Sequence, residues 1–145
     1  MTNWCENILV LEGPEADIAA FKEKAAAVLA EDAAVDAAEV LKLENFVPMP
    51  AVVQDPECGE AQDEWEMQSW GCTLGAHDSA ISTETKNCLH YVFQTPWSPP
   101  LAFLHNVSFD WPTLRMVLAY SEPGCGFQGI AKAAAGVMDD QCVNA

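Results

Sequence analysis

The sequence predicts an α+β fold of the ferredoxin-like type, an antiparallel or mixed sheet with two main helices on one face and an acidic helical insertion. Alternating apolar strands recur along the chain, and helical segments with an apolar stripe follow two of them. The order is that of two βαβ-like halves on either side of the insertion. With 145 residues, half of them apolar, we expect a single domain over residues 1–145, with the insertion at about residues 51–75.

The first half opens with a strand predicted at residues 4–11, where Cys5, Asn7 and Leu9 face one way and their neighbours the other. Gly13 ends this strand. Pro14 then begins a helix, because its missing N–H would have no partner in a first turn, and apolar residues recur at helical spacing to about residue 30. A second strand is predicted at residues 40–46. It ends at the two prolines of FVPMP, which cannot donate to a central ladder.

The insertion is predicted to contain a short helix rich in carboxylates. Asp55 and Pro56 are suited to an N-cap and a first helical position, and GEAQDEWEMQSW follows them. Trp65 and Trp70 are expected to anchor this helix to the rest of the domain, and Gly71 to end it.

The second half contains the most distinctive stretch of the chain, LHYVFQTPWSPP. Leu89, Tyr91 and Phe93 alternate with His90 and its neighbours, which predicts a buried strand over residues 89–95 that runs into a Pro-rich corner. The other elements predicted here are a strand at residues 76–82, a helix from Pro99 to about Ser108, a strand at residues 113–120 and a last strand through Phe127, Gly129 and Ala131.

Five motifs occur in a fixed order: MTNWCENILVLEGP, FVPMP, WEMQSWGC, YVFQTPWSPP and YSEPGCGFQG. Together they resemble the YubB-type (Api-like) ferredoxin-like domain family of plasmid and phage proteins, over nearly the whole chain. That family has a Lys-Trp-Asp run after its Trp-Gly pair, whereas Cys72 to Gly75 stand here, with Asp78 further on. The resemblance implies a ferredoxin-like fold and a mobile-element origin, and it carries over no catalytic residue.

Negative charge dominates the composition. The formal net charge is −16, of which residues 1–70 contribute −13 (16 acidic against 3 basic residues) and residues 71–145 contribute −3 (6 against 3). Such a field disfavours direct binding to nucleic acid or to an anionic membrane and favours a partner with a basic surface. A plain acidic surface that keeps the protein in solution is the alternative explanation.

Composition also bounds the compartment and the chemistry. The start of the chain resembles no secretory leader and no apolar stretch is long enough to span a membrane, so we expect a cytoplasmic protein. The six cysteines are then expected to be free thiols. No CxxC or Cys/His pair has metal-ligand spacing, and we predict neither a metal nor a cofactor.

The main functional hypothesis is an acidic inhibitor that occupies the nucleic-acid-binding surface of a host defence protein by imitating DNA phosphates. An anti-CRISPR or anti-restriction activity would be its biological form, and the oligomeric state stays open. The candidate contact residues are chosen for charge density: Glu31, Asp32, Asp36, Glu39, Asp55, Glu57, Glu60, Asp63, Glu64 and Glu66.

The alternative hypothesis is a small-molecule-binding or regulatory module that uses the Trp/Pro/Gly corner as a pocket. Tight corners need Trp, Pro and Gly for structural reasons too, and a buried indole N–H needs a polar neighbour, so a scaffold role explains these residue types as well. The candidate pocket residues are Trp4, Asn7, Trp70, Trp97, Glu122 and Phe127.

Catalysis is not predicted. His77 and Asp78, with Cys72 or Cys88, have the residue types of a nucleophile, base and orienting acid, but no spacing supports that geometry. The glycines of GCGFQG follow a Pro turn and enter a strand, which is the wrong context for a phosphate-binding loop. We therefore expect a binding protein, not an enzyme.

Overall fold

The computed structural model describes residues 2–28, 39–55, 57 and 59–144. Six strands form one sheet in the order β2-β3-β1-β4-β5-β6, and each neighbouring pair is antiparallel. The expectation of an antiparallel sheet is thus confirmed, and none of the described pairs is parallel. The strands are β1 (Trp4–Glu12), β2 (His77–Glu84), β3 (Cys88–Pro96), β4 (Arg115–Glu122), β5 (Phe127–Ala134) and β6 (Val137–Asn144).

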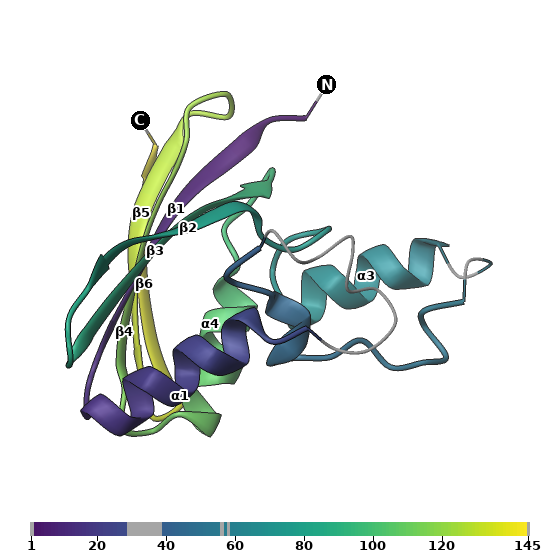
Figure 1. Cartoon of the computed structure of the whole chain (residues 1–145). Helices are drawn as coiled ribbons and strands as arrows, with labels where there is room; N and C mark the ends of the chain where they lie inside the picture. Colours follow the sequence, from purple (N-terminus) through teal and green to yellow (C-terminus); the bar gives the residue numbers. More distant parts are fainter. Residues whose placement is uncertain (1, 29–38, 56, 58, 145) are drawn as a thin grey trace.

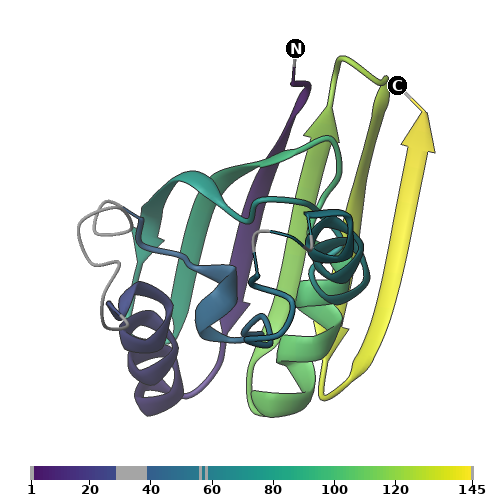
Figure 2. The ribbon, with the colours of Figure 1, turned by 90° about the vertical axis from the view of Figure 1, so that its right-hand side faces the viewer.

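The helices are α1 (Glu15–Ala26), the 3₁₀ turn η2 (Leu43–Asn45), α3 (Gly59–Ser69) and α4 (Leu101–Asp110). They lie on one side of the sheet, to its right in Figure 1 and in front of it in Figure 2. The sequence β1-α1-β2-β3-α4-β4, with strand order β2-β3-β1-β4, is ferredoxin-like, as predicted. The hairpin of β5 and β6 makes the sheet larger than that pattern requires. Residues 51–75, predicted to separate two βαβ halves, instead lie within the first half, between α1 and β2.

Strand alternation divides the sheet into two faces. On β1, Cys5, Leu9 and Leu11 are at most 2% exposed, whereas Ile8 between them is 45% exposed. Successive side chains of a strand point to opposite faces, so the buried set faces the helices and the other set faces away from them. We call these the covered face and the open face.

An aromatic cluster fills the space between the covered face and the helices. The Phe21 ring of α1 stacks on Phe46 with 4.5 Å between centroids, and Phe46 meets Phe103 of α4 edge to face at 5.8 Å. Trp111 contacts both Phe21 and Phe46. Because rings are large and pack closely in these geometries, this cluster fixes α1 and α4 against the sheet.

The strand predicted at residues 40–46 is wrong: this segment crosses the end of α1 and contains η2. The Lys42 ammonium lies 3.4 Å from the carbonyl oxygen of Ala27, and the Asn45 amide donates to the Lys24 carbonyl at 2.9 Å. Carbonyls at a helix C-terminus have no partner within the helix, and a cation there also meets the favourable end of its dipole. The apolar run of this segment therefore serves helix capping and core packing instead of a ladder.

The C-terminal strand β6 was not predicted at all. Its sequence, VMDDQCVN, contains two adjacent carboxylates and little apolar alternation, yet it pairs with β5 along eight residues, from Ala134↔Val137 to Phe127↔Asn144. An edge strand needs little burial, which explains why a pattern search misses it.

Helix α3 connects η2 to the sheet and projects away from it (Figure 1). Its C-terminal end meets the N-terminus of α4. The backbone N–H of Phe103 donates to the Trp70 carbonyl at 3.0 Å, and the Asn106 amide donates to Ser69 at 3.0 Å. Gly71 has φ +89°, and a Cβ there would lie 2.9 Å from the backbone nitrogen of Leu101, so only glycine permits this close approach.

Candidate functional site

The open face has an apolar centre. The register places Ile8 of β1 between Val92 of β3 and Ala119 of β4, and places Val10 beside Val117 in the next row. We call these five side chains the apolar belt. They come from three neighbouring strands that are far apart in sequence, and none of the described helices covers them.

Polar residues border the belt at both ends. At one end Gln94, Glu6 and Ser121 form a row across β3, β1 and β4. At the other end the Arg115 Nη2 lies 3.0 Å from Glu12 Oε2 in an exposed ion pair. An apolar centre with a polar border is the usual anatomy of an interaction surface.

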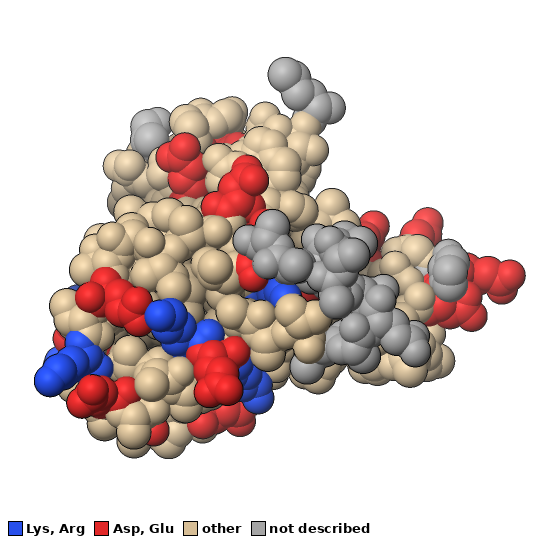
Figure 3. All heavy atoms as spheres, in the orientation of Figure 1, with Lys and Arg blue, Asp and Glu red and all other residues tan. Residues whose placement is uncertain are grey.

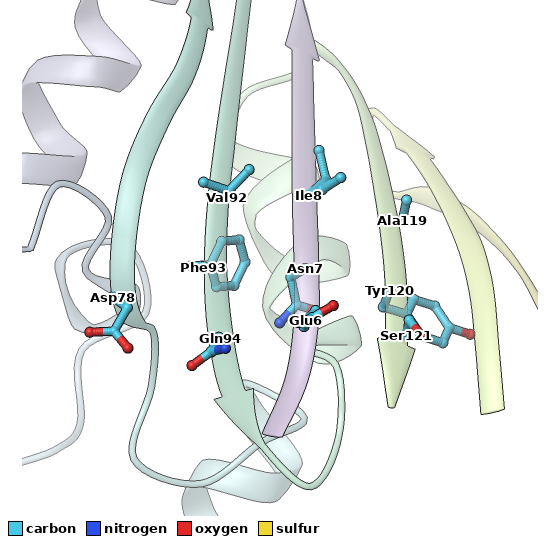
Figure 4. Close-up of a pocket in the computed structure, with 10 residues that line it drawn as sticks. All are labelled: Glu6, Asn7, Ile8, Asp78, Val92, Phe93, Gln94, Ala119, Tyr120 and Ser121. Carbon is cyan, nitrogen blue, oxygen red and sulfur yellow. The ribbon is translucent and has the colours of Figure 1, made fainter. Parts of the chain in front are cut away.

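Two hollows follow the belt. The first has a volume of about 480 Å³, and Figure 4 shows its lining side chains on β2, β3, β1 and β4, among them Glu6, Ile8, Asp78, Val92, Gln94, Ala119 and Ser121. The second has a volume of about 460 Å³ and lies towards β5 and β6, lined among others by Val10, Glu12, Arg115, Val117, Lys132, Val137 and Asp139.

A bulge places Asp78 at the edge of the first hollow. The pairing of β2 with β3 shifts register between His77 and Ala80, and Asp78 has φ +51° in the left-handed region. The Glu39 carboxylate accepts hydrogen bonds from the backbone N–H groups of Asp78 and Ser79 at 3.1 and 3.0 Å. Glu39, predicted as a partner contact, thus supports the turned backbone of this edge.

A buried polar cluster lies on the covered face at the same end of the sheet. The Asn7 amide donates to Thr95 Oγ1 at 3.0 Å and to the Cys5 carbonyl at 3.1 Å, and the Thr95 hydroxyl donates to the Ser98 carbonyl at 2.6 Å. Burial raises the pKa of the Cys5 thiol to about 11. The cluster ties the end of β3 to β1, which is the structural role expected for the corner after β3.

The six candidate pocket residues are divided between the two sides of the sheet. Trp4 belongs to the open-face set and meets His77 edge to face at 5.2 Å. Asn7 and Glu122 are buried on the covered face, where Phe127 is paired with Glu122. The other two occupy the corners: Trp97 has φ +68° and a half-exposed ring, and Trp70, at the end of α3, donates from its indole to the Val47 carbonyl at 2.9 Å.

A second covered-face feature was missed by the sequence reasoning. The Tyr120 hydroxyl donates to Asp140 Oδ1 of β6 at 2.7 Å, and it passes over Gly129, where a Cβ would lie 2.3 Å from that hydroxyl. The Tyr120 pKa is raised above its ordinary value, mainly by burial and secondly by the hydrogen bond to Asp140. The contact thereby joins β4, β5 and β6. In the sequence, Gly129 is the only residue that could have indicated this contact.

Apart from Glu39, which supports the turn at Asp78, the carboxylates proposed as partner contacts fall into three groups. Glu31, Asp32 and Asp36 lie outside the described residues. Glu66 is buried, its carboxylate accepts the Leu74 N–H at 2.9 Å, and desolvation raises its pKa. The remaining carboxylates are exposed on α3 and the segment before it: Asp55, Glu57, Glu60, Asp63 and Glu64.

The surroundings of the two candidate nucleophiles, Cys72 and Cys88, do little to activate a thiol. Burial raises the pKa of the Cys72 thiol to about 12, the opposite of what a thiolate nucleophile needs. Cys88 lies on the open face next to Glu12 in the β1–β3 register. Within the described ranges, no three His, Cys, Asp or Glu side chains gather as a metal site requires, and none of the described helices has the length and apolarity to cross a membrane.

Comparison with known proteins supports the fold. Residues 76–143, just under half of the chain, match the family model described as the ferredoxin-like domain in Api92-like protein. This match supports a relationship between the chain and Api92-like proteins. A crystal structure of a protein api92 from Yersinia pseudotuberculosis superposes with a TM-score of 0.74 and 9% identity, over 100% of this chain and 99% of that one. At that identity the likeness shows the fold alone. No curated protein matches the sequence.

Proposed function

We propose that this protein is an acidic binding protein of a plasmid or phage that occupies a basic, nucleic-acid-binding surface of a host defence protein in the host cytoplasm. It imitates DNA phosphates and needs no catalysis, cofactor or direct contact with nucleic acid. An anti-CRISPR or anti-restriction role is the biological form of this proposal. The mobile-element origin rests on the resemblance of the five motifs.

One observation carries the proposal: the isolated acidic surface of α3. Glu60, Asp63 and Glu64 are all exposed and stand three and four residues apart, so they share one face of the helix. Neither Lys nor Arg occurs anywhere between residues 43 and 85. In Figure 3 the α3 end of the molecule shows acidic side chains without basic neighbours, whereas the opposite end mixes both signs.

The physical basis is electrostatic complementarity to the basic surface of the partner. A basic surface binds DNA largely through its attraction to the phosphate charges. Carboxylates on a helix can take the place of these phosphates. Asp55 and Glu57 extend the α3 charge towards its N-terminus, where the Asp55 carboxylate accepts the Glu57 N–H at 3.0 Å. Because exposed charges are screened, binding of this kind weakens as salt rises.

The test is a charge reversal on α3 with a matched control. The variant Glu60→Lys, Asp63→Lys, Glu64→Lys is compared with Glu15→Lys, Glu23→Lys, Asp110→Lys, which makes the same change of net charge at exposed residues of α1 and α4. Tagged proteins are used to capture partners from host lysate at low and high salt, with duplex DNA as the eluting competitor.

We expect wild type and the control to retain a nucleic-acid-binding protein that salt and DNA release, and the α3 variant to lose it. Equal loss from both variants would attribute binding to bulk charge. Equal retention by both would contradict the proposal, as would a captured protein that DNA does not displace.

A further inference from the structure

We propose that the open face binds an amphipathic helix of a partner protein, whose apolar stripe lies on the apolar belt and whose Lys or Arg residues meet Glu6 and Asp78. This surface lies on the side of the sheet opposite α3, and the inference stands independently of the function proposed above.

The first step concerns the apolar residues of the open face. The core of the domain is on the covered face, where Leu9, Leu11, Leu118 and others are at most 2% exposed. Ile8, in the middle of the open face, contributes little to that core because it remains 45% exposed. Contiguous exposed apolar surface with a polar border is typical of a docking site.

Charge defines the chemistry of the partner. On the open face Arg115 is paired with Glu12, and Lys132 lies directly opposite Asp139 in the β5–β6 register. Among the described residues, Glu6 and Asp78 are the open-face carboxylates with no Lys or Arg opposite them in the strand register, and both line the first hollow. In the part of the chain that the structure describes, neither carboxylate has an ion pair.

The hollow therefore offers an apolar floor and two uncompensated carboxylates, which suits the aliphatic stem and cationic head of a Lys or Arg. Gln94 and Ser121 lie in the same row as Glu6 and supply further hydrogen-bonding groups. A partner with acidic residues at this position would meet repulsion.

The backbone of the partner must satisfy its own hydrogen bonds. The ladder groups of the belt strands are already paired within the sheet, and both hollows lie on its face, not at an edge. An extended peptide on this face would bury unpaired N–H and C=O groups, whereas a helix pairs them internally. A helix with its side chains is about 10–12 Å across, which covers two to three strands at their usual spacing.

The experiment uses a labelled amphipathic peptide helix of Leu and Lys, a version with Glu in place of Lys, and a scrambled version that breaks the apolar stripe. Binding is measured by fluorescence anisotropy at about physiological salt. We expect wild type to bind the Leu/Lys helix and to bind the other two peptides at least tenfold more weakly. The scrambled peptide loses apolar contacts, each worth about a factor of ten for a large side chain, and the Glu peptide is repelled by Glu6 and Asp78.

The deciding variant is Ile8→Glu. It adds negative charge, so a merely electrostatic attraction to a basic peptide would strengthen, whereas docking on the belt would weaken about tenfold or more. Val52→Glu is the matched control, because Val52 is 77% exposed and lines neither hollow. Should Ile8→Glu fail to fold, Ile8→Ala removes the apolar contact without a charge, and a several-fold loss is expected.

Glu6→Gln with Asp78→Asn tests the charged part, and Asn tolerates the left-handed backbone of residue 78. This double variant should lose most of the preference for the Lys peptide over one with Gln in its place, while Glu15→Gln with Glu23→Gln should keep it. Equal or tighter binding by Ile8→Glu would overturn the proposal. So would a wild-type dimer that Ile8→Glu dissociates in sedimentation equilibrium, because a second copy would then occupy the face.

Discussion

The two faces of the sheet are built from the same strands and have different tasks. On β1, Leu9 is 2% exposed beneath the helices, while its neighbour Ile8 is 45% exposed on the other side. On the covered face the buried Asn7 amide and Thr95 hydroxyl are hydrogen-bonded to each other, whereas on the open face Glu6 and Asp78 have no ion pair among the described residues. Stability is therefore expected to reside on the covered face and recognition on the open face.

The largest test of this division is a pair of substitutions one residue apart. Leu9→Ala should lower the free energy of unfolding by about 2–5 kcal/mol, because it opens a cavity in the core. Ile8→Ala should cost less than about 1 kcal/mol, since half of that side chain already contacts water. Urea denaturation monitored by circular dichroism measures both. Equal costs would contradict the division, because they would mean that Ile8 is packed as closely as Leu9.

Alternation along the strands is what made the division predictable. Cys5, Asn7 and Leu9 on β1, and Leu89, Tyr91 and Phe93 on β3, were assigned to one face from the sequence, and the structure buries all of them. Alternation depends only on the pleat, so it survives without knowledge of the partner strands.

The candidate site could not be predicted in the same way. The apolar belt joins Ile8, Val92 and Ala119, whose contact depends on strand order and register, and neither is encoded in a local pattern. Residues 40–46 failed for a related reason, because a short apolar run has the same appearance in a strand and in a core-packed turn. The signal that existed was the second half of the β1 alternation, with Ile8 and Val10 on one side.

A smaller test uses the buried thiol of the covered face. Burial raises the pKa of Cys5 to about 11, so folding favours the neutral thiol. A raised pKa contributes stability that is fully present below the ordinary thiol pKa near 9 and is lost as pH rises towards 11. The free energy of unfolding should fall over that window, and Cys5→Ala should flatten the fall by about 1–2 kcal/mol.

Cys125→Ala is the matched control, since it removes an exposed thiol instead of a buried one. Thiol labelling gives a second measurement: Cys125 and Cys142 should react with a disulfide reagent at once, and Cys5 only on unfolding. Rapid labelling of Cys5 in the native protein would mean that water reaches the covered face.

The smallest and most specific test compares two tyrosines of the covered face. Tyr120→Phe removes the hydrogen bond to Asp140 that joins β4 to β6, and should cost about 0.5–1.5 kcal/mol. Tyr91→Phe removes a buried hydroxyl with no hydrogen-bond partner among the described residues, so it should be neutral or stabilising. The two changes delete the same atom, and the difference between their unfolding free energies isolates the value of the partner. Equal costs for the two substitutions would show that burial of the hydroxyl, and not its hydrogen bond, determines the loss of unfolding free energy. The hydrogen bond between β4 and β6 would then not contribute to holding the outer hairpin in the sheet.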